Sequence, residues 1–224
     1  MLNWAARYYP ILRAFEQHNL LSSGSVLEIG CGPVGLGTFR KVPFVGCDLS
    51  FQDPPPGWPM TPVVASAADL PFEDRSFDAV LGSDVLEHIP PDLRTTVISE
   101  ALRVARQLVI FGFPCGSTAH DADKALRQLY LSKDLEVPIW LEEHMLAPFP
   151  EESLFREFPG WTVTQIGNES IAFHSWMMRR EMGRVFRRGS SLLLRLAPRI
   201  FEYWLRKADT APFYRKIFIL TRED

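Results

Sequence analysis

The run VLEIGCGPVGLG, which begins at Val26, constrains the fold of this chain more than any other feature of its sequence. Its β-branched and apolar residues favour a buried strand, and the glycines at positions 30, 32 and 35 favour a turn in which the backbone can approach a ligand closely. The G-x-G-x-x-G spacing is also the fingerprint of dinucleotide-binding proteins, and it occurs in turns that bind nothing. The run therefore predicts a strand, a glycine-rich loop and the start of a helix, and the neighbouring residues must decide the ligand.

Apolar runs of strand length recur along the chain, separated by helical or loop segments. We expect strands over residues 25–29, 43–47, 61–65, 77–81, 107–113, 161–166 and 215–220. Residues 91–105 and the N-terminal segment carry apolar residues at helical spacing. This alternation predicts an α/β fold of the Rossmann-like, doubly wound kind, with a mostly parallel seven-stranded sheet, helices on both faces and a helical insertion before the last strand.

Length and composition fit one globular domain. The chain has 224 residues, of which 46% are hydrophobic and 23% charged. We expect a single domain over 1–224, with 167–212 as a helical insertion or lid. No stretch reaches the roughly 18 uncharged apolar residues that a membrane-spanning helix needs. The cysteines at positions 31, 47 and 115 fit neither a disulfide framework nor a zinc spacing, which favours a cytoplasmic location.

Three residues near the glycine-rich run bear on its ligand. Glu28 places a carboxylate at the end of the first strand, and Pro33 removes an N–H group that a pyrophosphate would use. Asp48, which ends the second apolar run, can accept hydrogen bonds from both ribose hydroxyls, although a helix cap or turn is its alternative role. A cationic amino acid beside a sulfonium tolerates Glu28, so these residues favour S-adenosylmethionine over NAD or FAD.

Four motifs, VLEIGCG, VGCDLS, AADLPFEDRSFDAV and SDVLEHI, follow one another between residues 25 and 89. In this order and spacing they resemble the class I S-adenosylmethionine-dependent methyltransferases of the type 11 branch. The resemblance implies a cofactor-binding set made of Glu28, Gly30, Gly32 and Ser83 around the methionine part, Asp48 with its neighbour Leu49 at the ribose, and Asp69 with Leu70 at the adenine.

One segment departs from the pattern of these methyltransferases. They usually have a helix after the ribose-binding Asp, and the sequence FQDPPPGWPMTP in residues 51–62 cannot form one. We therefore expect this side of the sheet to be covered by a loop. Phe51 and Trp58 are candidates for stacking on the adenine, with ordinary surface covering as the alternative.

The motif SDVLEHI follows the fourth predicted strand, at the sheet edge where ligands bind in doubly wound folds. His88 and His144 are the candidate catalytic residues, because an imidazole can deprotonate an acceptor hydroxyl or amine near neutral pH. A structural, hydrogen-bonded histidine is the alternative for His144. Together with Asp84 and Glu87 these side chains could hold a divalent ion. The same motif occurs in metal-free members of the branch, however, so no metal is predicted.

Residues 178–207 form a basic segment, with nine arginine or lysine residues against two glutamates. Apolar residues are interleaved with the arginines, a pattern typical of interfacial helices. We expect a helical lid that recruits a hydrophobic or anionic acceptor, with peripheral contact to a membrane surface. A helical pair packed on the domain or on a second subunit is the alternative. Nucleic acid is disfavoured as a partner because few aromatic residues lie among these arginines.

The predicted function is transfer of a methyl group from S-adenosylmethionine to an oxygen or nitrogen of a small or lipid-linked acceptor. The alternative from another class is a non-catalytic partner subunit that keeps the cofactor fold. A third, an NAD-dependent oxidoreductase, is disfavoured by Glu28 and Pro33.

Overall fold

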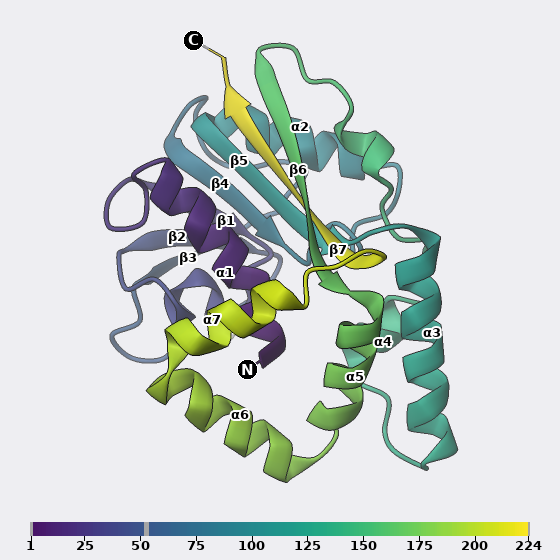
Figure 1. Ribbon diagram of the computed structural model, residues 1–224. Helices are drawn as coiled ribbons and strands as arrows, with labels where there is room; N and C mark the ends of the chain where they lie inside the picture. Colours follow the sequence, from purple (N-terminus) through teal and green to yellow (C-terminus); the bar gives the residue numbers. More distant parts are fainter. Residues whose placement is uncertain (1, 52–53, 224) are drawn as a thin grey trace.

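The computed structural model of the protein describes residues 2–51 and 54–223. Its seven strands form one sheet in the order β3-β2-β1-β4-β5-β7-β6, as Figure 1 shows. The strands are β1 (Val26–Ile29), β2 (Phe44–Asp48), β3 (Met60–Val64), β4 (Phe77–Ser83), β5 (Ala105–Pro114), β6 (Trp161–Ser170) and β7 (Phe213–Arg222). The predicted fold class is therefore confirmed.

All neighbouring strands run parallel except those that pair with β7. This strand lies between β5 and β6 and is antiparallel to both, with Ile219 opposite Ile110 on one side and Thr164 on the other. The other six strands therefore end at the same edge of the sheet. In a doubly wound fold this carboxyl edge is the place for a ligand.

Side chains alternate between the two faces of the sheet along each strand, and helices cover both faces. Val26 packs on the face covered by α1 (Leu2–Gln17), and the next residue, Leu27, packs on the face covered by α2 (Arg94–Val104). Ala79 and Val80 of β4 divide in the same way between the two faces. The helices predicted at the N-terminus and between the fourth and fifth strands are thus both present.

The helix expected after the glycine-rich loop is reduced to the 3-10 helix η1 (Gly35–Thr38), so this detail of the prediction was wrong. Trp58 fills part of the space, since its Nε1 donates to the Val34 carbonyl at 2.7 Å and a Cβ on Gly37 would lie 2.4 Å from that nitrogen. Trp58 and Phe51 pack against the core on the α1 side. As predicted, no helix is seen in the described part of the Pro-rich segment; residues 52 and 53 lie outside the described residues.

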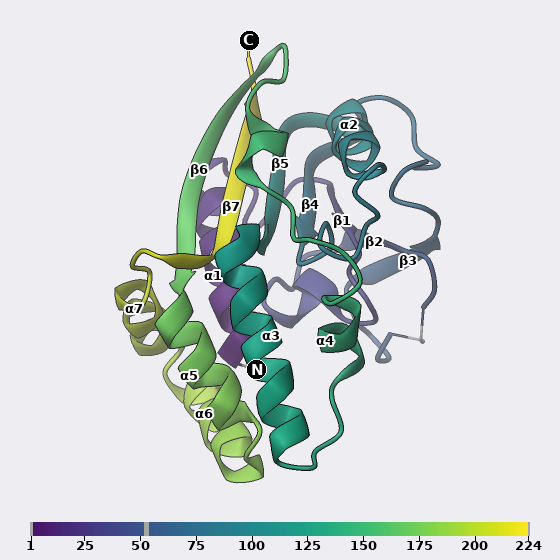
Figure 2. The same cartoon turned by 90° about the vertical axis from the view of Figure 1, so that its right-hand side faces the viewer.

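Five helices gather beyond the carboxyl edge of the sheet (Figures 1 and 2). They are α3 (Gly116–Ser132), α4 (Ile139–Glu143), α5 (Ile171–Glu181), α6 (Arg184–Leu196) and α7 (Pro198–Lys207); the 3-10 helix η2 spans Glu152–Phe155. With the start of α1 they enclose a separate apolar cluster that includes Leu126, Leu141, Met177, Leu194 and Leu205. The segment before the last strand is thus helical, as expected. None of the described helices is long and apolar enough to cross a membrane.

Candidate active site

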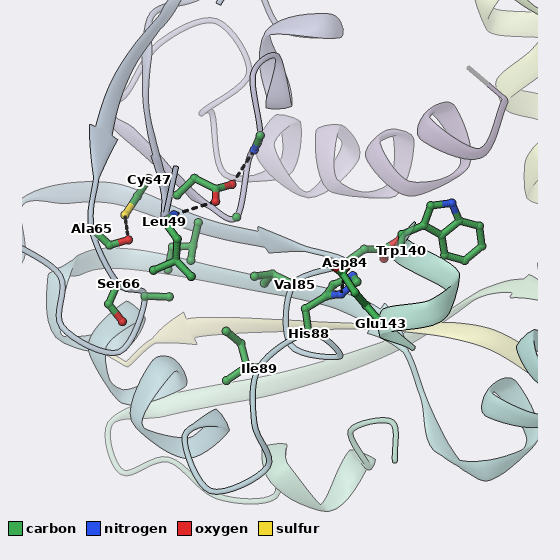
Figure 3. A pocket seen from close by; sticks show the side chains of 15 residues that line it. Cys47, Leu49, Ala65, Ser66, Asp84, Val85, His88, Ile89, Trp140 and Glu143 are labelled. Atoms are coloured by element: carbon green, nitrogen blue, oxygen red, sulfur yellow. Dashed lines mark hydrogen bonds and ion pairs between the residues drawn. The ribbon is translucent and has the colours of Figure 1, made fainter. Parts of the chain in front are cut away.

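A cavity of about 400 Å³ opens at the carboxyl edge of the sheet. Its walls come from the segments that follow β1, β2, β3 and β4, and from α4. Figure 3 shows Cys47, Leu49, Ala65 and Ser66 at one end and Asp84, His88, Trp140 and Glu143 at the other. Four strand ends and a helix therefore converge on one elongated pocket, the arrangement that a doubly wound sheet offers a nucleotide-like ligand.

Gly30 and Gly32 line the pocket, and a side chain is disfavoured at each position for a different physical reason. Gly30 has φ +67°, and a Cβ there would lie 2.5 Å from Val85 Cγ2, so only glycine fits beneath that side chain. Gly32 has φ +56°, and a Cβ there would meet nothing within 4 Å. Its requirement is conformational, because side chains disfavour this left-handed region. The backbone at Gly32 is accordingly free to be approached from the cavity.

Asp48 joins the glycine-rich loop to the end of β2. Its Oδ2 accepts a hydrogen bond from the Gly32 N–H at 3.0 Å, and its Oδ1 accepts from the Leu49 N–H at 2.8 Å. Each carboxylate oxygen still has a lone pair for a further donor, and Asp48 and Leu49 both line the cavity. The position suits a pair of ribose hydroxyls, and the ribose role of Asp48 stays a prediction.

Glu28 does not reach the wall of this cavity. It is 1% exposed, and its carboxylate accepts hydrogen bonds from the Tyr8 hydroxyl at 2.5 Å and from the Leu36 N–H at 2.6 Å. Burial raises the pKa of Glu28 to about 7, against the opposing effect of these two donors. In this structure Glu28 holds the loop from beneath, and its contact with the methionine part stays a prediction.

The remaining predicted cofactor residues lie near the cavity without lining it. Asp69 is exposed and donates its N–H to the Ser66 carbonyl, whereas the Leu70 side chain is buried in the core on the α2 side. The residues of this loop that do line the cavity are at positions 65–67. The Ser83 hydroxyl is buried at the end of β4 with no hydrogen-bond partner among the described residues. The motif thus located the right loop, with Asp69 two positions and Leu70 three positions along the chain from the nearest residue that lines the cavity.

A second cavity of about 480 Å³ adjoins the first, because Asp84, His88 and Trp140 line both. Its other walls come from the loop after β4, the end of α4, α1, α5, α6 and the start of β7. The residues include Arg7, Glu87, His144, His174, Arg187 and Arg215. His88 and His144, the two predicted catalytic residues, both lie here, with ring centroids 4.9 Å apart. The structure therefore brings them together, at or beside the junction of the two cavities.

Asp84 is the centre of a buried ion-pair network that the sequence did not reveal. It accepts from Arg215 Nε at 2.7 Å and Nη2 at 2.8 Å, and Arg7 lies 3.2 Å away. Burial would raise the pKa of Asp84, but the two guanidinium groups hold it below its usual value. Arg215 is 1% exposed and also pairs with Glu169. These pairs fix the loop after β4 to β6, β7 and α1.

A second buried network positions His144. Its Nδ1 lies 2.6 Å from Asp123 Oδ2, and the Tyr214 hydroxyl donates to the same oxygen at 2.9 Å. His174 stacks on Tyr214 at 3.4 Å and lies 3.7 Å from Asp123 Oδ1. Burial would lower the pKa of His174, but Asp123 and Glu169 raise it above its usual value. The sequence gives one signal for this network, namely polar residues inside otherwise apolar helical and strand runs. That signal does not indicate which of these residues contact one another.

Glu87 and His88 differ in their partners. Glu87 is fully buried, and burial together with the Asp84 carboxylate raises its pKa well above the usual value. His88 Nδ1 lies 3.1 Å from Glu143 Oε2. Burial and the neighbouring His144 lower the pKa of His88, so its ring is neutral near pH 7. A neutral imidazole at the junction of two cavities can accept a proton or bind an electrophile.

Comparisons with known proteins agree with this geometry. Residues 27–111 match the model of a methyltransferase domain family. The magnesium protoporphyrin IX methyltransferase of Synechocystis PCC 6803, crystallised with bound S-adenosylhomocysteine, shares the fold with a TM-score of 0.53 and 14% identity over 96% of this chain and 81% of its own. The PH0226 protein of Pyrococcus horikoshii OT3 gives 0.50 and 16% over 99% and 90%. No relative was found among curated protein sequences.

The chain therefore has the Rossmann-like fold of these methyltransferases, and its residues 27–111 match a methyltransferase domain family by sequence. This confirms the resemblance that the four motifs carry. It also supports the prediction of S-adenosylmethionine as the cofactor, while the acceptor is left open.

Proposed function

We propose that the protein transfers a methyl group from S-adenosylmethionine, bound in the first cavity, to an oxygen or nitrogen of an acceptor bound in the second. The observation that carries the proposal is the junction of the two cavities at Asp84, His88 and Trp140. A cofactor held by the loop at Gly32 and by Asp48 could direct its sulfonium end towards this junction. The non-catalytic alternative gives no reason for a second cavity at that end.

Methyl transfer from a sulfonium depends more on the alignment of the reacting atoms than on acid, base or nucleophilic groups of the protein. A lone pair of the acceptor forms a bond to the methyl carbon while the carbon–sulfur bond breaks and its electrons return to sulfur, giving S-adenosylhomocysteine. The proton of the acceptor passes to a base or to water. Holding nucleophile, methyl and sulfur in line supplies much of the rate enhancement. The role of the protein is to hold the cofactor and the acceptor in adjoining cavities so that these three atoms lie in line.

Incubation with methyl-labelled S-adenosylmethionine and fractionated small-molecule and lipid extracts tests the proposal. We expect a labelled product in one fraction, and no product with the Asp48→Ala protein. Cofactor binding without transfer to any fraction would favour the partner-subunit alternative.

His88→Ala is expected to lower kcat for that acceptor at least about tenfold, because proton transfer by a positioned side chain contributes more than this in many enzymes. The affinity for S-adenosylmethionine should stay within about twofold, since the ring lies at the junction of the two cavities, at the opposite end of the first cavity from Leu49 (Figure 3). Steady-state kinetics, a cofactor titration and a melting curve separate the effects. Loss of stability in parallel with activity would mark His88 as a structural histidine.

The nature of the acceptor is indicated by α6. Arg187 lines the second cavity and also a basic surface groove of about 680 Å³ shared with Arg184, Arg188 and Arg195. Exposed apolar side chains lie beside these arginines on α6 and α7, among them Val185, Leu192, Leu196 and Ile200. One side of the helices packs on the domain through Leu194 and Leu205. The opposite side of the two helices carries exposed arginines and exposed apolar side chains, the two features of an interfacial helix. These features support a lipid-linked acceptor and a lid that contacts an anionic membrane surface.

Flotation with anionic and neutral liposomes tests this lid. Wild-type protein should float with anionic vesicles at low salt and less at high salt, because arginine–phosphate attraction is screened. Changing Arg184, Arg187 and Arg188 to Glu should abolish flotation. The matched control, Arg75, Lys133 and Arg156 changed to Glu, alters the net charge equally at exposed sites elsewhere and should still float. Absence of wild-type flotation at low salt would leave only the packing role.

A further inference from the structure

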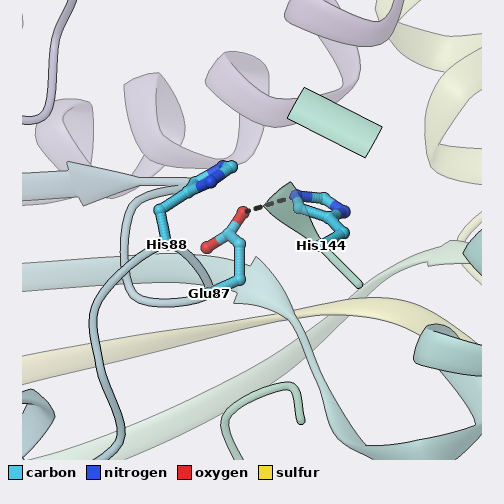
Figure 4. Close-up of side chains that lie close together, drawn as sticks. All are labelled: Glu87, His88 and His144. Carbon is cyan, nitrogen blue, oxygen red and sulfur yellow. Dashed lines mark ion pairs between the residues drawn. The ribbon is translucent and has the colours of Figure 1, made fainter. Parts of the chain in front are cut away.

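The side chains of Glu87, His88 and His144 form a cluster at the wall of the second cavity (Figure 4). One ligand atom from each lies within 4.8 Å of the others. The carboxylate of Glu87 lies beside the two rings, whose centroids are 4.9 Å apart, and its Oε1 is 4.0 Å from His144 Nε2. Two imidazoles and a carboxylate are a ligand set that divalent first-row metals accept.

Glu87 is the reason to look for a ligand here. Both of its carboxylate oxygens are buried, and neither has a hydrogen-bond partner among the described residues. The fixed cations nearby are already engaged, because Arg7 and Arg215 pair with Asp84 and Arg215 also pairs with Glu169. A buried carboxyl group without a partner is costly. A cation between Glu87 and the two rings would supply the missing one.

Both histidines are held as metal ligands usually are. His144 Nδ1 contacts Asp123 at 2.6 Å, which leaves Nε2 directed at Glu87. His88 Nδ1 contacts Glu143 at 3.1 Å, so Nε2 is the nitrogen left for a further ligand. A carboxylate on the far nitrogen fixes the ring and its tautomer in many metal sites. Asp123 and Glu143 thus already occupy the supporting positions.

The spacing also suits an ion. Metal–ligand distances of about 2.0–2.2 Å put tetrahedral donors roughly 3.4 Å apart. The observed gaps are 4.0 Å between His144 and Glu87 and at most 4.8 Å within the cluster, so side-chain movements on the order of 1 Å would close it. Three protein ligands leave at least one coordination position, and the cluster borders the second cavity. Metal sites that act on substrates keep such a position free.

We propose that Glu87, His88 and His144 bind one divalent transition-metal ion, such as Zn²⁺ or Co²⁺, with its open position facing the acceptor cavity. This revises the expectation from sequence that no metal is bound. The ion would take an oxygen-bearing acceptor, a hydroxyl or carboxylate, as its remaining ligand, and His88 would then act as a metal ligand in place of accepting the proton. That second part rests on the proposed function, whereas the binding of the ion rests on the three side chains alone.

The probe is Co²⁺ added to chelator-dialysed full-length protein, followed by visible absorption, with Zn²⁺ as competitor and calorimetry for stoichiometry. We expect a ligand-field band that saturates at one equivalent and is displaced by Zn²⁺. Glu87→Gln, His88→Gln and His144→Gln should each weaken Co²⁺ binding at least about tenfold. Asp123→Asn, which weakens the supporting contact to His144 and also changes those to Tyr214 and His174, should weaken it about 10- to 100-fold. His18→Gln, outside the cluster, is the matched control and should bind as wild type.

No cobalt band and no heat with Zn²⁺ in wild-type protein would overturn the metal site, as would full binding by all three ligand variants. The wild-type measurement decides even where a variant fails to fold. A titration of metal-free protein with S-adenosylmethionine, run in parallel, keeps the two proposals apart. Cofactor binding without metal binding removes only the metal site, and metal binding without cofactor binding removes only the methyltransferase proposal.

Discussion

Asp48→Ala is expected to weaken S-adenosylmethionine binding at least about 100-fold while the protein stays folded. The ribose would lose two hydrogen bonds to a charged group, each worth about 1.5–3 kcal/mol. The loop would also lose the bonds that Asp48 accepts from Gly32 and Leu49, so a modest fall in melting temperature is expected. Calorimetric titration and a melting curve measure the two effects separately.

Asp92→Ala is the matched control, because Asp92 is an exposed carboxylate that lines neither cavity. Its variant should bind S-adenosylmethionine as wild type does. If Asp48→Ala also keeps its affinity, Asp48 only ties the loop to β2 and the ribose assignment fails.

Arg215→Met should be the most destabilising of the substitutions considered. It removes the cation between Asp84 and Glu169. The buried Glu169 is left with His174 as its remaining ion-pair partner, and Asp84 with Arg7 alone. Removing one partner of a buried pair costs about 3–5 kcal/mol, since an uncompensated charge is left behind. For a chain of this size that corresponds to a fall in melting temperature of roughly 10 °C. Chemical and thermal unfolding provide the measurement.

Lys216→Met, at the next position of β7, serves as the control. Its ion pair with Glu152 is partly exposed, and such pairs contribute at most about 1 kcal/mol. Adding Glu169→Gln to Arg215→Met should recover part of the lost stability, because the orphaned charge is removed. Equal effects of Arg215→Met and Lys216→Met would show that the buried network adds nothing.

The sheet could be predicted from sequence because its information is local. Alternating burial on two faces leaves apolar runs such as 107–113, and the glycines after β1 specify a backbone shape that few other residues adopt. Asp48 was likewise found from its place at the end of a strand. These signals depend on neighbours in the chain and survive without tertiary structure.

The acceptor side could not be predicted in the same way, because its residues meet only through the tertiary fold. Asp84 and Arg215 are 131 positions apart in the sequence. His144, at the end of α4, contacts Asp123 of α3. Glu28 shows the opposite difficulty. Its place in the motif predicts a contact with the cofactor, yet the Tyr8 hydroxyl, from α1, helps to bury the carboxylate under the loop. Sequence motifs name residue types, and packing decides which atoms reach the cavity.

The central claim, that the first cavity binds S-adenosylmethionine, is tested most directly by calorimetric titration of the wild-type protein with S-adenosylmethionine, S-adenosylhomocysteine and NAD. We expect saturable binding of S-adenosylmethionine and S-adenosylhomocysteine at one site per chain, and no binding of NAD. Binding of NAD alone, or of none of the three, would contradict the account.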